Sequence, residues 1–80
     1  MRDDRLRLND ILEPIELIQT FSGGKTLTNL VSDRLYQSAV LHQLYVIGES
    51  ASRVSETIKS RHQNIPWKVI YGFRNHIAHE

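Results

Sequence analysis

Residues 33–61 read DRLYQSAVLHQLYVIGESASRVSETIKSR, and this stretch determines the expected fold. Its apolar residues alternate at spacings of four and three, as on one face of an amphipathic helix. These residues are Val40, Leu44, Ile47, Ala51, Val54 and Ile58. We therefore expect one helix over the whole stretch, about 43 Å long at 1.5 Å per residue. Gly48 within it would let another helix approach closely, although glycine costs about 1 kcal/mol of helix propensity.

A second amphipathic pattern lies over residues 3–21. Its apolar residues share one expected buried stripe: Leu8, Ile11, Leu12, Ile15, Ile18 and Phe21. Pro14 lies inside this pattern, and because the stripe continues in phase beyond it, we expect a kink rather than a break. Gly23 and Gly24 then end the helix, and residues 26–32 are expected to add a short helical turn.

The triplet Gly24-Lys25-Thr26 resembles the end of a phosphate-binding loop. That motif requires a glycine five positions earlier, where Gln19 stands, and a strand before it, where we expect a helix. We interpret the triplet as a connection between two helices.

The last segment predicts a further helix. Residues 62–64 interrupt the preceding pattern, and Pro66 is well placed at the first turn of a new helix. Trp67, Ile70, Phe73 and Ile77 then repeat at spacings of three, three and four, and we expect them to be buried. No segment has a strand pattern, so the sequence predicts an all-α fold.

These lengths imply that something else covers part of the long helix. A first helix of about 28 Å cannot cover a stripe of about 43 Å. We expect the remainder to be covered by a helix after residue 80, by a second copy of the chain, or by both. The last helix also has no stop signal at residues 78–80, so we expect the natural chain to continue.

Composition excludes several classes of protein. The 80 residues are 40% hydrophobic, carry a net charge of +1 and contain no cysteine. Disulfide frameworks, cysteine-ligated zinc and thiol catalysis are therefore excluded, and the overall charge does not favour nucleic acid or a membrane. The charged start MRDDRLRLND is unlike a signal peptide, and no apolar run reaches the roughly 18 residues that a membrane span needs. We expect a soluble, cytoplasmic domain.

Residues 72–80, GFRNHIAHE, concentrate the groups that carry chemistry. Imidazole suits proton transfer near neutral pH, and guanidinium binds phosphate in a bidentate manner. With no carboxylate cluster nearby in sequence, the segment favours metal-free phosphodiester chemistry, and we expect no metal site. The spacing of Arg74 and His79 decides little alone, because seven Arg and four His give roughly 0.3 such matches by chance.

The order of motifs along the chain is more specific. Arg-Asn-x-x-x-His on a late helix, after a long helix carrying IGESA at 47–51, resembles the HEPN superfamily, and most closely the HepT-type toxins paired with minimal nucleotidyltransferase antitoxins. DRLRLNDIL at 4–12 and NIPW at 64–67 fit that group too. The resemblance implies one HEPN-like domain over residues 1–80, an antiparallel helical bundle without its C-terminal helices. It also implies homodimerisation, metal-independent RNA cleavage without a cofactor, and neutralisation by a nucleotidyltransferase antitoxin.

The same resemblance assigns roles to individual residues. Arg74 and His79 correspond to the catalytic pair, and Asn75 is the supporting residue beside them. Glu49 and His76 are possible site-lining residues, although we interpret Glu49 first as a polar residue of a helix interface and His76 first as a surface residue. The family's motif continues to a tyrosine two residues after the histidine, the proposed target of adenylylation, and this sequence ends one residue short of it.

Helix geometry indicates that two copies would build the site. Arg74 and His79 lie about 140° apart around an ideal helix, whereas Asn75 and His79 lie about 40° apart. Two motif helices meeting across a dimer axis would bring two Arg and two His around one phosphate. The expected product is a 2′,3′-cyclic phosphate. The alternatives are a non-catalytic binding subunit that accompanies a nucleotidyltransferase, and a plain helical dimerisation domain.

Overall fold

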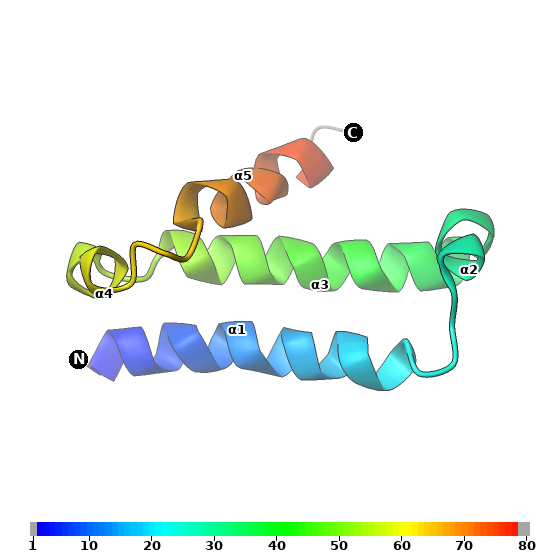
Figure 1. Cartoon of the computed structure of the whole chain (residues 1–80), viewed down its shortest axis with the longest axis horizontal. Coiled ribbons are helices and arrows are strands. Elements are labelled where there is room, and N and C mark those ends of the chain that lie inside the picture. Colours follow the sequence, from blue (N-terminus) through cyan, green and yellow to red (C-terminus); the bar gives the residue numbers. More distant parts are fainter. Residues whose placement is uncertain (1, 79–80) are drawn as a thin grey trace.

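The computed structural model describes the backbone of residues 2–78 and the side chains of residues 3–75. This part of the chain forms five helices and no strand: α1 (Arg2–Phe21), α2 (Leu27–Ser32), α3 (Arg34–Ser52), α4 (Glu56–Arg61) and α5 (Trp67–Ala78). Helix α3 lies between α1 and α5 and runs antiparallel to both (Figure 1). The predicted all-α, antiparallel bundle is confirmed.

Local signals in the sequence define the first three helices. Helix α1 continues through Pro14 without a break and is followed by Gly24, whose φ of +77° favours glycine. Thr26 caps α2 in a reciprocal capping box with Asn29. The carboxylate of Asp33 accepts hydrogen bonds from the first amides of α3. The expected helical turn at residues 26–32 and the helix–helix role of Gly24-Lys25-Thr26 are both confirmed.

The single helix predicted over residues 33–61 is wrong, because the chain turns between Ser52 and Glu56. Ser55 begins α4, and its hydroxyl accepts a hydrogen bond from the amide of Ile58. Ser55 also donates two hydrogen bonds to the buried carboxylate of Asp4 in α1. Its amide donates to Oδ1 at 2.8 Å, and its hydroxyl donates to Oδ2 at 2.6 Å. Asp4 therefore stabilises a corner that begins a second helix.

This correction removes the length argument for a covering partner. Helix α3 has 19 residues and α1 has 20, so both are about 30 Å long. The two helices match, and α1 is long enough to lie along all of α3.

A different observation shows that the apolar faces are incompletely covered. Among the described residues, the apolar residues that are buried are Ala51 and Val54. Leu12 and Phe73, which the periodicity places in buried stripes, are each 52% exposed, and Leu8 is 39% exposed. The prediction that they are buried is therefore wrong for this chain, because α1 and α5 each pack against α3 and leave one side of the layer open.

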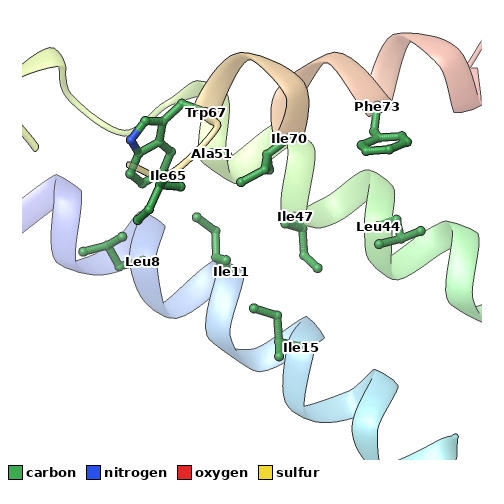
Figure 2. Close-up of a pocket in the computed structure, with 10 residues that line it drawn as sticks. All are labelled: Leu8, Ile11, Ile15, Leu44, Ile47, Ala51, Ile65, Trp67, Ile70 and Phe73. Carbon is green, nitrogen blue, oxygen red and sulfur yellow. The ribbon is translucent and has the colours of Figure 1, made fainter. Parts of the chain in front are cut away.

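The open side is an apolar groove of about 360 Å³ between α1, α3 and α5. Figure 2 shows ten apolar side chains around it: Leu8, Ile11, Ile15, Leu44, Ile47, Ala51, Ile65, Trp67, Ile70 and Phe73. The apolar residues predicted from periodicity thus do gather, but around a groove rather than in a closed core. Within the described part of the chain, no helix has the length and apolar character needed to cross a bilayer.

Candidate functional site

Helix α5, which carries the Arg-Asn motif, lies very close to α3 at Gly48. This glycine is buried, and a Cβ atom at its position would lie 3.2 Å from the Cβ of Arg74 and 3.2 Å from the carbonyl oxygen of Ile70. A larger residue would therefore push α5 away from α3. The predicted close approach at Gly48 is confirmed, and it places Arg74 directly against α3.

Arg74 forms an ion pair with Glu49, the residue after this glycine. Its Nη1 donates a hydrogen bond to Oε1 of Glu49. The other carboxylate oxygen, Oε2, lies 3.8 Å from Nη2 of Arg53, one helical turn further along. We call Glu49, Arg53 and Arg74 the Glu49 cluster. It carries two positive charges and one negative charge, so it keeps a net positive charge.

The cluster can hold a guanidinium in place while leaving it able to bind an anion. The side chains of Arg74 and Glu49 are 35% and 29% exposed, so water and a ligand can reach them. A guanidinium has five N–H donors, and the Glu49 contact uses one of those of Arg74. Its buried Nε has no hydrogen-bond partner among the described residues. Such an arginine suits a phosphodiester, whose oxygens accept from two N–H groups at once.

The structure accounts for part of the predicted set of site residues. It brings Glu49 to Arg74, and Asn75, the next residue along α5, has an exposed side chain. His76 lies in α5, but its side chain is outside the described atoms, and His79 lies outside the described residues. The pairing of Arg74 with His79 therefore stays a prediction.

Arg53 was missed from the sequence. Its signal is local, because an acidic residue followed four positions later by a basic one forms an ion pair on a helix. Arg53 is the C-cap residue of α3. It lies one helical turn after Glu49, so its side chain reaches the Glu49 carboxylate. Among the described residues, no three potential metal-ligating side chains of the His, Asp or Glu type come together.

Comparison with known proteins identifies the family. The family described as Ribonuclease HepT-like matches residues 11–80, which include Glu49, Arg74 and His79. The chain belongs to the HepT-like ribonuclease family. No solved structure gives a significant match to this HepT-like chain.

Individual relatives agree with this assignment. A protein named "Probable ribonuclease HepT" from Thermococcus cleftensis is 33% identical over 72 residues, covering 90% of this chain and 66% of the relative. A protein of Caldanaerobacter subterraneus, provisionally named as an RNase, is 29% identical over all 80 residues and 71% of its own length. A Methanocaldococcus jannaschii protein, named as a gamma-glutamylcyclotransferase joined to a provisionally assigned RNase, is 33% identical over 67 residues. That match covers 84% of this HepT-like chain but 30% of the length of the relative.

Proposed function

We propose that this HepT-like protein is a metal-independent endoribonuclease and the toxin of a toxin–antitoxin pair. Family membership supports the ribonuclease chemistry, and relatives carry ribonuclease names. The observation that carries the proposal is the position of Arg74. Gly48 lets α5 approach α3 closely at this residue, and Glu49 forms an ion pair with the guanidinium of Arg74, whose side chain is 35% exposed. A guanidinium fixed in this way is prepared for the charge that develops on a phosphate during cleavage.

The proposed reaction is an internal transfer at phosphorus. One His79 takes the proton of the ribose 2′-OH, whose oxygen attacks the neighbouring phosphorus. The bond from phosphorus to the 5′-oxygen breaks, and a second donor, the partner copy's His79 in our proposal, protonates that oxygen. Arg74 stabilises the negative charge on the phosphate, and Asn75 orients the base or the phosphate. The products are a 2′,3′-cyclic phosphate and a 5′-hydroxyl.

The proposal includes a homodimer and a nucleotidyltransferase antitoxin. The dimer is supported by helix geometry, because Arg74 and His79 of one ideal helix lie about 140° apart and two copies can surround one phosphate. Exposed apolar side chains such as Leu12 and Phe73 also favour further association. A reading frame for a small nucleotidyltransferase next to this gene would support the antitoxin.

The test is growth inhibition by the full-length protein in a host that lacks the antitoxin. His79→Ala should abolish inhibition, because loss of a general base or acid typically lowers the rate by 10²–10⁴-fold. His76→Ala is the matched control, since it removes a second imidazole from the same helix and should leave most of the activity. The assignment of the catalytic histidine is wrong if His79→Ala remains fully toxic, or if His76→Ala is the change that silences the protein. Inhibition that persists in both variants and in Arg74→Ala would favour a binding subunit instead.

A further inference from the structure

Positive charge is concentrated in one part of this nearly neutral chain. Residues 57–79 contain four Lys and Arg and no Asp or Glu, whereas the other 57 residues contain six Lys and Arg and all nine Asp and Glu. The basic segment comprises most of α4, its connection to α5, and α5 itself. A concentrated positive potential of this kind attracts an anionic ligand to one region of the surface.

A second groove lies where α4 meets the start of α5, and all of its lining residues except Glu56 belong to this basic segment. We call it the α4–α5 groove; it has a volume of about 310 Å³. Its lining includes two lysines, two aromatic rings and one carboxylate: Lys59, Lys68, Trp67, Tyr71 and Glu56. It differs from the wholly apolar groove of Figure 2, which opens between α1, α3 and α5.

Contacts inside the α4–α5 groove fix the positions of Lys59 and of the two aromatic rings. The ammonium of Lys59 lies 5.0 Å from the ring centroid of Tyr71, within the range of a cation–π interaction. The indole of Trp67 donates a hydrogen bond of 3.0 Å to the carbonyl oxygen of His62. The ammonium of Lys59 lies 3.7 Å from the carboxylate of Glu56; the side chain of Lys59 is 13% exposed and that of Glu56 is 93% exposed. An anion therefore reaches Lys59 by displacing this exposed carboxylate, which costs little.

The aromatic residues of the groove, Trp67 and Tyr71, lie on the same side of α5 as Arg74, whereas Lys68 lies about 120° from Arg74 around the helix, at the edge of the groove. Trp67 and Tyr71 are about 40° apart around the helix, and Tyr71 and Arg74 are about 60° apart. Along the axis, Tyr71 precedes Arg74 by about 4.5 Å, and Lys68 precedes it by about 9 Å. Because a stacked strand rises about 3.4 Å per nucleotide, these positions are one to three nucleotides from a phosphate at Arg74.

We propose that the α4–α5 groove is a subsite for single-stranded RNA next to the cleaved phosphodiester. A base stacks on the face of Tyr71 that Lys59 does not cover, while Lys59 and Lys68 contact the phosphates on either side of that base. Aromatic stacking combined with basic contacts is how proteins hold single strands without reading a long sequence. This inference rests on the proposed ribonuclease function, and it adds the part of the surface that holds the RNA beside the site of cleavage.

The test measures binding of a single-stranded 2′-O-methyl RNA to the full-length protein by fluorescence anisotropy. This probe lacks the 2′-OH nucleophile, so binding is separated from cleavage. Tyr71→Leu should weaken binding about ten-fold, because a stacked base contributes strongly to affinity. Lys59→Gln and Lys68→Gln should each weaken binding. Each should also make the negative slope of log K against log salt shallower by about 0.7, the value for one phosphate contact to a single strand.

Lys25 provides a matched control. Its ammonium lies 5.2 Å from the ring centroid of Tyr36, so Lys25→Gln removes the same charge from a similar contact outside the basic segment. Lys25→Gln should bind the probe as the unaltered protein does. Lys68 is exposed, so Lys68→Gln should keep its fold, which far-UV circular dichroism will verify.

The groove proposal is overturned if Lys59→Gln and Lys68→Gln bind like the unaltered protein, if Lys25→Gln is equally weakened, or if the unaltered protein does not bind the probe. An acidic protein partner is then the better occupant. Cleavage of unmodified RNA separates this failure from failure of the ribonuclease proposal. If the unaltered protein cleaves RNA and the groove variants bind the probe as tightly as it does, the groove proposal alone is wrong. Groove-dependent binding without cleavage supports the groove and overturns the ribonuclease.

Discussion

Alanine at Gly48 should disturb the contact between α3 and α5, whereas alanine at Gly72 should not. Both glycines lie in helices, so each change gains about 1 kcal/mol of helix propensity. At Gly72, no described atom lies within 4 Å of the new Cβ atom. Gly72→Ala should therefore stabilise the protein by close to the full amount, which raises Tm by about 4–8 °C for a domain of this size.

At Gly48 the same gain is opposed by crowding. The new Cβ atom would lie 3.2 Å from both the Cβ of Arg74 and the carbonyl oxygen of Ile70, whereas carbon contacts are most favourable at about 3.5–4.0 Å. Both opposing atoms are fixed to the backbone of α5, so the whole helix must shift. Overpacking of this kind costs about 1–3 kcal/mol. Gly48→Ala should therefore be less stable than Gly72→Ala by about 1–3 kcal/mol.

Thermal and urea unfolding followed by far-UV circular dichroism, at one protein concentration, will measure this difference. Gly48→Ala should also reduce RNA cleavage, because the shift moves Arg74 relative to Glu49. If Gly48→Ala stabilises the protein as much as Gly72→Ala does, then α5 does not approach α3 closely at this residue. The geometric basis for the position of Arg74 would then be wrong.

Three other predictions concern the rest of the molecule. The hydrogen bonds from the hydroxyl and then the amide of Ser55 hold the pKa of the Asp4 carboxyl below its ordinary value of 3.8. Asp4 therefore contributes stability above that pH and loses it as the pH falls through the lower folded value, so acid unfolding of Asp4→Asn should depend less steeply on pH below about 3.8. Arg74→Lys should lower cleavage about 10²-fold, because one ammonium cannot replace the forked guanidinium, while the midpoint of urea unfolding changes little; full activity would contradict the role of Arg74. Sedimentation at micromolar concentration should show a dimer or larger assembly, and a stable monomer would argue against the composite site.

Local patterns predicted most of the fold correctly. Helix α1 and the start of α5 agree with the periodicity and with Pro66, because caps and apolar stripes act over a few residues. The turn between α3 and α4 was missed because Val54 and Ile58 stay in phase across it, with Val54 buried. The partner that stabilises this turn, Asp4, is 51 residues away from Ser55, so no local pattern can reveal it.

The candidate site was partly visible in the sequence for a similar reason. Gly48 indicates a close helix contact, and the sequence favours Glu49 first as an interface residue, but the pairing of Glu49 with Arg74 spans 25 residues. The exposure of Phe73 could not be predicted either. Periodicity identifies which side of a helix is apolar, but whether another element covers that side depends on tertiary packing.

The central claim is tested most directly by the ends of the RNA products. The purified protein is incubated with unmodified single-stranded RNA in EDTA, beside Arg74→Ala and His79→Ala. The proposed mechanism predicts cleavage that persists in EDTA, leaves 2′,3′-cyclic phosphate and 5′-hydroxyl ends, and is lost in both variants. An absolute requirement for added magnesium or manganese, products with 3′-hydroxyl ends, or undiminished cleavage by His79→Ala would contradict it.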